Sequence, residues 1–315
     1  MDSSERVNAW FASHTFAHPQ VSVKDVVALK RGRRVSAILP SRNEETTLPV
    51  ILSALDGLGD LLDEVLVIDS RSTDRTAELA EAAGATVLQV RDDDDSGKGG
   101  ALRLGVARMT GEIGVFLDAD VVDFDTGFPV ALLHTLLSQD DLLLVKGFYD
   151  RPWGGSAEEA ESRVTGGGRV TELVARPLIA RRAPLLAGFA QPLAGEVAFV
   201  REALVDLPFV SGYGVDIALL LGVLERRGLD AMAQVDLGVR LHGHQELDAL
   251  GSMALQVAAA FDIWLGDAPS VERLRTTVRR DASGLQLDEQ PVRTWLLGAP
   301  SSVYTDSSTA DTLGS

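Results

Sequence analysis

Cysteine is absent from this chain of 315 residues, and basic side chains are scarce. The lack of cysteine excludes disulfide bonds, thiolate metal ligands and cysteine nucleophiles. Only 29 lysine and arginine residues face 46 aspartate and glutamate residues, so the formal net charge is −17. A chain of that charge is unsuited to phosphate backbones and to anionic membranes. We therefore expect no nucleic-acid partner and no membrane partner.

Long apolar runs are missing as well. No stretch reaches the roughly 18 uninterrupted apolar residues that a membrane span needs. The first residues, Met1–Glu5, lack the basic and apolar regions of a signal peptide, and we expect a cytoplasmic protein. Apolar residues still make up 45% of the chain, enough for a sizeable core in one large or two modest domains.

From Arg34 onward, short apolar runs alternate with segments of helical period. The pattern predicts strands at 35–39, 64–69, 86–90 and 113–117 and helices at 46–58, 74–83 and 101–109. After Asp120 the pattern is less regular, with strands expected at 142–148, 196–200 and 231–239 and helices at 169–179, 215–227 and 250–265. Such alternation indicates an α/β fold with a mostly parallel, Rossmann-like sheet and helices on both faces.

The most informative motif is Asp118-Ala119-Asp120, at the end of the apolar run 113–117. Carboxylates at the carboxyl end of a strand lie at the rim where open α/β sheets bind ligands. One carboxylate can meet a divalent cation such as Mg²⁺ or Mn²⁺, and the other a ribose or sugar hydroxyl. Such a pair suits a nucleoside diphosphate sugar, although the motif alone is also typical of a solvated strand end.

Two glycine-bearing segments suggest anion binding. Lys98, in Gly97-Lys98-Gly99-Gly100, precedes a predicted helix and can reach a diphosphate, or it can be a solvated lysine in a flexible loop. Gly166-Gly167-Gly168 leads into Arg169 and Thr171, which together suit a carboxylate or phosphate. A flexible linker explains those glycines but not the arginine and threonine.

Two histidines, His242 and His244, follow the predicted strand 231–239. One of them can complete a cation site with Asp120, because imidazole and carboxylate ligands suit Mn²⁺. The plain alternative is a pair of hydrogen-bonded histidines at a strand end.

Together these segments resemble the glucosyl-3-phosphoglycerate synthase family, which are retaining GT-A glycosyltransferases of family 81. The resemblance covers roughly residues 5–265 and is most specific at 166–177, 187–196 and 208–216. It implies donor contacts at Pro40, Ser41, Glu44, Ser70, Lys98, Asp118 and Leu193. It also implies acceptor contacts at Gly168, Arg169, Thr171 and His244, metal ligands at Asp120 and His242, and catalytic roles for Asp216, Arg169 and Lys98.

The resemblance implies one GT-A domain. Its parts are an N-terminal arm (1–33), a nucleotide-sugar-binding half (34–120), an acceptor-binding half (121–280) and a partly disordered C-terminal tail (281–315). We expect a metal-dependent enzyme, using Mg²⁺ or Mn²⁺, that transfers a sugar with retention from a UDP- or GDP-linked donor to a small carboxylated acceptor. We also expect a homodimer, with the apolar helix 250–265 packed either on the core or in the dimer interface.

Some positions depart from the family pattern. Gly243 stands where the family usually has arginine, Arg71 replaces a small glycine, and Asp216 replaces glutamate. One alternative is therefore an antibiotic-pathway glycosyltransferase, such as the lincosamide-pathway enzyme that joins a GDP-sugar to a thiol acceptor. An alternative of another class is a non-catalytic sugar-nucleotide-binding protein. A sugar nucleotidyltransferase is disfavoured because the first loop, 40–44, lacks glycine.

Overall fold

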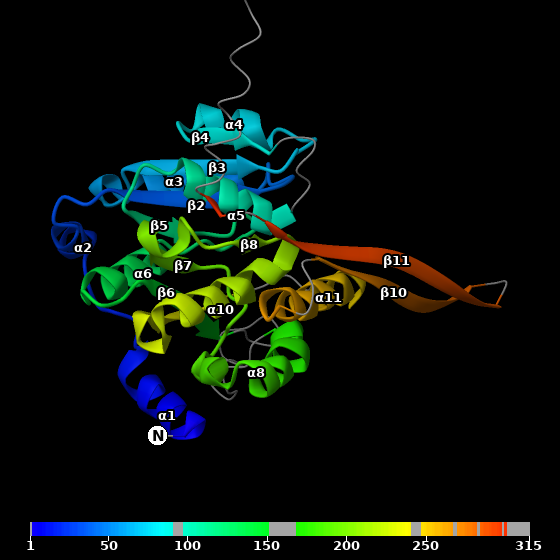
Figure 1. The fold of residues 1–315 in the computed structure, drawn as a ribbon. Coiled ribbons are helices and arrows are strands. Elements are labelled where there is room, and N and C mark those ends of the chain that lie inside the picture. The colour runs from blue at the N-terminus through cyan, green and yellow to red at the C-terminus, as the bar shows by residue number, and fades with distance from the viewer. Residues whose placement is uncertain are drawn as a thin grey trace, which may run out of the picture.

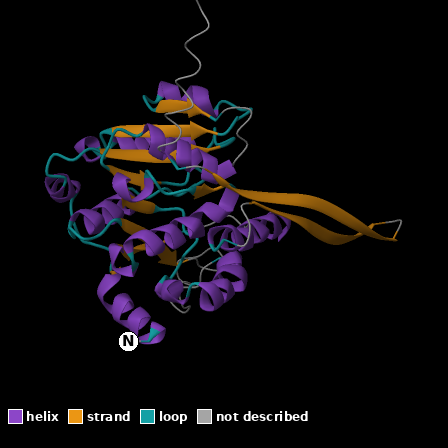
Figure 2. Cartoon of the chain, viewed as in Figure 1, coloured by secondary structure: helices purple, strands orange, loops and turns teal. Residues whose placement is uncertain are grey.

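The computed structural model describes residues 2–90, 97–150, 168–240, 247–266, 270–281, 284–297 and 299–300. A central sheet of eight strands runs through the body, with helices packed against it (Figures 1 and 2). Among the helices that the structure describes, none has the length and apolar character of a membrane-spanning segment.

The strand order in the main sheet is β1-β9-β6-β7-β5-β2-β3-β4. Strand β7 runs antiparallel to its neighbours β5 and β6, and all other neighbouring pairs are parallel. The predicted mostly parallel α/β sheet is thus confirmed. The strands are β1 (Thr15–Phe16), β2 (Val35–Ser41), β3 (Glu64–Asp69), β4 (Thr86–Gln89), β5 (Ile113–Phe116), β6 (Leu144–Asp150), β7 (Val197–Val200) and β9 (Met232–Val239).

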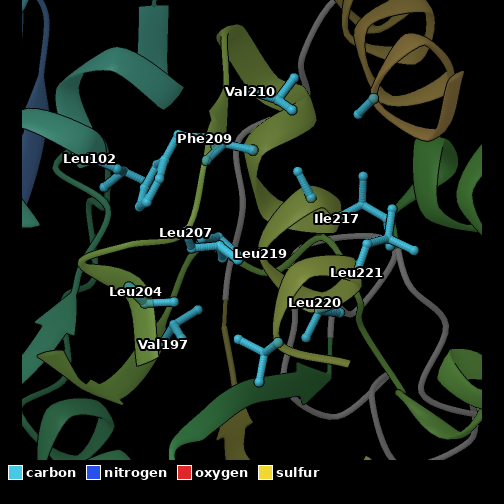
Figure 3. Close-up of a cluster of buried hydrophobic side chains, with 14 of the residues drawn as sticks. Leu102, Val197, Leu204, Leu207, Phe209, Val210, Ile217, Leu219, Leu220 and Leu221 are labelled. Atoms are coloured by element: carbon cyan, nitrogen blue, oxygen red, sulfur yellow. The ribbon is translucent and has the colours of Figure 1, made fainter. Parts of the chain in front are cut away.

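Two apolar clusters sandwich this sheet, because successive strand side chains point to opposite faces. Ile38 belongs to one cluster, and its neighbours Ala37 and Leu39 belong to the other. Figure 3 shows part of the first cluster, with Phe209 and Val210 of β8 (Phe209–Val210) beside α10. The first cluster includes side chains of α5 (Gly97–Arg108), α8 (Arg176–Arg182), α10 (Val215–Arg227) and α11 (Leu247–Trp264). The second cluster includes side chains of α2 (Val23–Leu29), α3 (Leu48–Asp56), α4 (Thr76–Ala82) and α6 (Gly127–Leu137). The structure also describes helices α1 (Ser3–His14) and α9 (Arg201–Leu204).

Helix α6 is one of the elements that the sequence pattern misses. Nine of its eleven residues are buried, so its sequence shows no alternation between an apolar and a polar face. A helix that is apolar on all sides has no signature of helical period. The helix expected at 250–265 is present as α11 and contributes Val257, Ala260 and Phe261 to the first cluster, so it packs on the core.

The C-terminal segment differs from the expected tail. Strands β10 (Ser270–Asp281) and β11 (Gly284–Leu297) form a long antiparallel hairpin, and β11 also pairs with β8. Figure 1 shows this hairpin projecting from the body beside α11. Much of the pairing lies outside the core, so the sequence of β11 carries no regular apolar alternation by which a strand is predicted.

The glycines around Lys98 also differ from the expected loop, because helix α5 already begins at Gly97. A Cβ on Gly99 would overlap the backbone carbonyl of Val210. Gly99 therefore allows a close contact between α5 and β8, rather than flexibility. This contact fixes the start of the helix, and with it the position of Lys98.

Candidate functional site

The site lies where the parallel strands end, at the rim predicted for Asp118 and Asp120. Strand β5 ends at Phe116, and the amide of Leu117 still bonds the carbonyl oxygen of Ile38 (3.1 Å), so the chain leaves the sheet at Asp118. The hydroxyl of Thr47 donates to the carbonyl oxygen of Ala119 (2.7 Å). A Cβ on Gly195 would overlap the Asp118 carboxylate, so this glycine makes room for that side chain.

Lys98 lies between two carboxylates from distant parts of the chain. Its Nζ is 3.1 Å from Oδ1 of Asp118 and 3.3 Å from Oδ2 of Asp216, in the first turn of α10. Burial alone would lower the pKa of Lys98, but Asp118 and Asp216 outweigh it and raise the pKa. The ammonium therefore stays charged at neutral pH, and it links the DAD motif to α10.

Arg240 is a residue of this site that the sequence analysis missed. Its guanidinium pairs with the buried Glu196, donates to the Tyr149 hydroxyl (3.0 Å), and lies 4.0 Å from Asp118 and 3.9 Å from Asp120. It also lies over the Tyr149 ring, 5.2 Å from the centroid. The only signal in the sequence was its position directly after β9, two residues before His242.

The electrostatics of this cluster favour a bound cation. Desolvation by burial and the neighbouring Asp118 raise the pKa of Asp120, although Arg240 and Lys98 oppose this. The side chain of Asp120 is nevertheless 58% exposed, so its oxygens remain accessible. A divalent cation would relieve the repulsion between the carboxylates, and Mg²⁺ binds through one or two carboxylates plus phosphate oxygens. The described carboxylates therefore fit such an ion.

His242 and His244, the proposed metal ligand and acceptor contact, lie outside the described residues, as do Gly166 and Gly167. Within the described ranges, no group of three or more histidine or acidic side chains has a geometry that would hold a metal ion. Asp120 is thus the one proposed ligand whose position the described part of the chain gives.

Hydrogen bonds join the loops that follow β2 and β3. The amide of Glu44 donates to the Thr76 hydroxyl (2.8 Å), and the amide of Ser70 to the carbonyl oxygen of Ser41 (2.8 Å). Desolvation is the main cause that raises the pKa of Glu44, and Asp120 adds to it. Pro40, Ser41, Glu44 and Ser70, the expected nucleoside contacts, are therefore brought together beside the DAD motif.

Arg71 lies in the second of these loops and shows why glycine would suit its position. Its φ is +59°, in the left-handed region that side chains with a Cβ rarely adopt. Arginine here costs local strain that glycine avoids. Asn43 in the neighbouring loop has the same φ, and its side-chain oxygen accepts from the amide of Thr73 (2.8 Å).

The expected acceptor residues begin a helical segment. Gly168 precedes the helical residues Arg169 and Val170, and the chain continues through a π-helical stretch, Thr171–Ala175, into α8. Thr171 is buried, whereas Arg169 lies at the surface. A π-helical turn is rare and frequently marks a functional site. Leu193 is half-buried against the first cluster, two residues before Gly195.

Comparisons with known proteins agree with this architecture. Residues 36–145 match the model of glycosyl transferase family 2. A glucosyl-3-phosphoglycerate synthase of Mycolicibacterium smegmatis is 46% identical over 79% of this chain and 84% of the relative. Another, from Petrotoga mobilis, is 40% identical over 75% of both chains.

Solved structures show the same similarity. A mannosyl-3-phosphoglycerate synthase from Rubrobacter xylanophilus superposes with a TM-score of 0.82 at 32% identity, covering 94% of this chain and 98% of that one. A Mycobacterium tuberculosis glucosyl-3-phosphoglycerate synthase, in complex with Mn²⁺, UDP and glucosyl-3-phosphoglycerate, gives a TM-score of 0.76 at 37% identity and covers 92% and 99%.

A parallel sheet with one reversed strand and an Asp-x-Asp pair at its rim defines, with these similarities, a glycosyltransferase of the GT-A fold. The identities above extend over most of the chain and beyond the family 2 segment. The chain belongs to the glucosyl-3-phosphoglycerate synthase family.

Proposed function

We propose that this chain transfers glucose from UDP-glucose to the hydroxyl of 3-phosphoglycerate, with retention at the anomeric carbon and with a divalent cation bound. The observation that carries the proposal is the cluster of Lys98, Asp118, Asp120 and Asp216 at the sheet rim. Relatives that are 40–46% identical over 75% or more of the chain are named glucosyl-3-phosphoglycerate synthases, and a related structure contains Mn²⁺, UDP and the glucosylated product.

The donor would lie across the ends of β2, β3 and β5. Pro40, Ser41, Glu44 and Ser70 would contact the nucleoside, and Asp118 the ribose or the sugar. Lys98 would turn toward the diphosphate, since its charged ammonium lies beside Asp118. Asp120 and His242 would hold the cation, which supplies positive charge against the leaving diphosphate.

The acceptor would lie beside the sugar, on the face that carries the diphosphate. Gly168, Arg169 and Thr171 would bind its phosphate and carboxylate groups, because an arginine and amides at the start of a helix suit anions. His244 would complete this subsite. Leu193 and Asp216 would border the sugar between donor and acceptor.

The side chains at the site favour retention of configuration at the anomeric carbon. Asp216 is buried and pairs with Lys98, so it is positioned to accept a sugar hydroxyl rather than to attack the anomeric carbon. The acceptor hydroxyl would attack on the face from which the diphosphate departs. The bond from the anomeric carbon to the phosphate oxygen breaks, the bond to the acceptor oxygen forms, and the acceptor proton passes to the departing phosphate oxygen.

The donor sugar is the least constrained part of the proposal. The relatives that are 40–46% identical over 75% or more of the chain are named glucosyl enzymes, whereas the mannosyl enzyme whose structure is similar is 32% identical. Sequence identity therefore favours UDP-glucose over a GDP-mannose donor.

The test is a transfer assay followed by mass spectrometry and by NMR of the anomeric proton. UDP- and GDP-linked glucose and mannose are each combined with 3-phosphoglycerate, or with small carboxylated alcohols and thiols, in the presence of Mg²⁺ or Mn²⁺. We expect α-glucosylated phosphoglycerate from UDP-glucose and no product after EDTA treatment. A product formed only with a thiol acceptor, or donor binding without any product, contradicts the proposal.

We also propose that the chain forms a homodimer through the β10–β11 hairpin. In the three-stranded sheet β10-β11-β8, strand β10 has one neighbour among the described residues, which leaves one backbone edge for another chain. The β10 sequence carries Arg273, Arg275, Arg279 and Arg280 in a chain of net charge −17, so a second copy offers complementary charge. Light scattering should give twice the chain mass, and a chain with residues 270–297 replaced by a short linker should be monomeric.

A further inference from the structure

The segment 209–214 joins the C-terminal hairpin to the donor site. It consists of β8, Ser211 and a 3₁₀ turn, Gly212–Gly214, and it leads directly into α10, whose second residue is Asp216. In Figure 1, β8 lies beside α5, near the point where the hairpin leaves the body. A displacement of this segment therefore displaces Asp216.

The end of β11 holds one side of the segment. Residues 296 and 297 of β11 pair with β8, and residues 295–297 are here called the hairpin base. The amide of Ser211 donates to the carbonyl oxygen of Trp295 (3.0 Å), and the amide of Trp295 donates to the Ser211 hydroxyl (3.0 Å). Ser211 is only 2% exposed, so water cannot replace a lost partner at little cost.

Helix α11 holds the other side. Oε1 of Gln256 accepts from the amide of Tyr213 (2.8 Å). A Cβ on Gly212 would overlap the Gln256 carboxamide, and one on Gly214 would come within 2.8 Å of the Cβ of Ala260. The two glycines therefore let the turn lie directly against α11, and Gln256 fixes the contact.

Helix α5 also rests on this segment. A Cβ on Gly97 would lie 3.3 Å from the Cα of Gly212, and Gly99 contacts the carbonyl of Val210 as described above. Lys98 stands between these two glycines, and its Nζ is 3.3 Å from Oδ2 of Asp216. One segment thus sets the positions of both members of the Lys98–Asp216 pair.

The two members of the pair depend on the segment to different degrees. Lys98 has a second partner, Asp118, at 3.1 Å, and Asp118 follows β5 in another part of the sheet. Asp216 follows the segment directly in the chain. Loosening the segment should therefore move Asp216 more than Lys98.

We propose that Ser211 and Gln256 are positioning residues of the donor site. They hold the segment 209–214 between the hairpin base and α11, and in this way they fix the place of Asp216 beside Lys98. The inference rests on the proposed function, because it takes Asp216 as a sugar contact and Lys98 as a diphosphate contact. Ser211 and Gln256 act through Asp216 and do not themselves contact the donor.

The first test compares Gln256→Leu with Gln256→Glu, using calorimetric binding of UDP-glucose and of UDP in the presence of Mn²⁺. Gln256→Leu removes the acceptor of the Tyr213 amide, so the affinity for UDP-glucose should fall about fivefold, the effect of roughly one hydrogen bond. The affinity for UDP should be unchanged, because UDP lacks the sugar and Lys98 keeps Asp118. Gln256→Glu retains an acceptor oxygen and should restore binding of UDP-glucose.

The second test uses Ser211→Ala with Ser36→Ala as the matched control. The Ser36 hydroxyl is also buried and also accepts from a backbone amide at 3.0 Å, that of Gly111, but it lies at the amino end of the sheet. Ser36→Ala should lower the free energy of unfolding at least as much, because this hydroxyl also donates to Glu64. Only Ser211→Ala should weaken binding of UDP-glucose while leaving that of UDP unchanged.

A double-mutant cycle tests the route through Asp216. In an Asp216→Ala background, Gln256→Leu should cause no further loss of UDP-glucose affinity. If Ser211→Ala fails to fold, the Gln256 variants at the border of the core decide alone.

Equal losses of UDP and UDP-glucose binding, an undiminished loss in the Asp216→Ala background, or unchanged UDP-glucose binding by folded Gln256→Leu overturns the inference. Wild-type protein that binds UDP-glucose but does not glucosylate 3-phosphoglycerate overturns the proposed function instead, and the binding comparisons then still judge Ser211 and Gln256. Wild-type protein that binds no UDP-glucose overturns both.

Discussion

Acidic residues lie at both ends of the central parallel strands, but their pKa values shift in opposite directions at the two ends. At the amino ends, acidic residues bond the backbone of the neighbouring segment. Asp63 accepts from the amide of Val35 (2.7 Å) and from Lys30, and Glu112 accepts from the amide of Arg34 (2.8 Å). The pKa of each is lowered: the bond from Arg34 lowers that of Glu112, and the bonds from Lys30 and Val35 overcome the burial of Asp63.

At the carboxyl ends, burial and neighbouring negative charges raise the pKa values of the acidic residues more than their hydrogen-bond and ion-pair partners lower them. The pKa values of Glu44, Asp120, Glu196 and Asp216 are all raised, with desolvation as the leading cause. Oε2 of Glu196 and Nε of Arg240 are buried and have no hydrogen-bond partner among the described residues. One end of the sheet therefore stabilises the fold, whereas the other stores unfavourable electrostatics that a bound donor and cation would relieve.

The largest effect should come from breaking the buried pair at the carboxyl end. Arg240→Met leaves Glu196 without its cation, and losing one partner of a buried ion pair costs about 3–5 kcal/mol. Urea unfolding monitored by circular dichroism measures this change. Arg227→Met, which removes an exposed pair with Glu202, should cost less than about 1 kcal/mol. Similar losses in both variants would contradict the comparison.

Asp120→Ala should separate function from stability. The change removes a proposed cation ligand, so we expect more than about a hundredfold loss of transfer. Unfolding should be nearly unchanged, because the residue is largely exposed and contributes repulsion. Steady-state kinetics at saturating Mn²⁺ and thermal melting are the two measurements. Near-normal activity would refute the metal assignment.

Asp63→Ala should show the reverse pattern at the amino end. Removing an acceptor shared by Lys30 and Val35 should cost about 1.5–3 kcal/mol at pH 7 and leave kcat unchanged. The folded-state pKa lies below the ordinary value of 3.8, so the stabilisation is complete above that value and is lost as pH falls through the folded pKa. Denaturation at pH 7 and at pH 3 checks this. The loss of stability caused by Asp63→Ala should be smaller at pH 3 than at pH 7, and a larger loss at pH 3 would contradict the prediction.

Glu44→Gln should give the smallest effect, with a gain in stability. The folded-state pKa of Glu44 lies above the ordinary value of 4.5, so its charge opposes folding as pH rises above that value. Removing the charge should add roughly 0.5 kcal/mol at pH 7 and nothing below pH 4. UDP affinity should fall at the same time, because Glu44 is a proposed nucleoside contact. A loss of stability at pH 7 would contradict the assignment of repulsion to this end of the sheet.

Local sequence patterns predicted a large part of the fold and the location of the Asp118–Asp120 pair at the rim of the sheet. Strand ends are set by short apolar runs, so Asp118 and Asp120 could be placed at the rim, and α10 matches the predicted range 215–227. The helix α6 could not be predicted, because it is buried on nearly every side. The hairpin β10–β11 could not be predicted either, because its pairing lies largely outside the core.

The sequence by itself determined the α/β class, the absence of cysteine side chains, and the carboxylates, lysine and glycines of the proposed donor site. Tertiary structure alone decided which charges meet. Arg240 follows β9 and Glu196 precedes β7, and no local spacing connects them with Asp118 or Asp216. Burial then sets the pKa values and the strength of every interaction, because desolvation depends on what packs around a group and not on its neighbours in sequence.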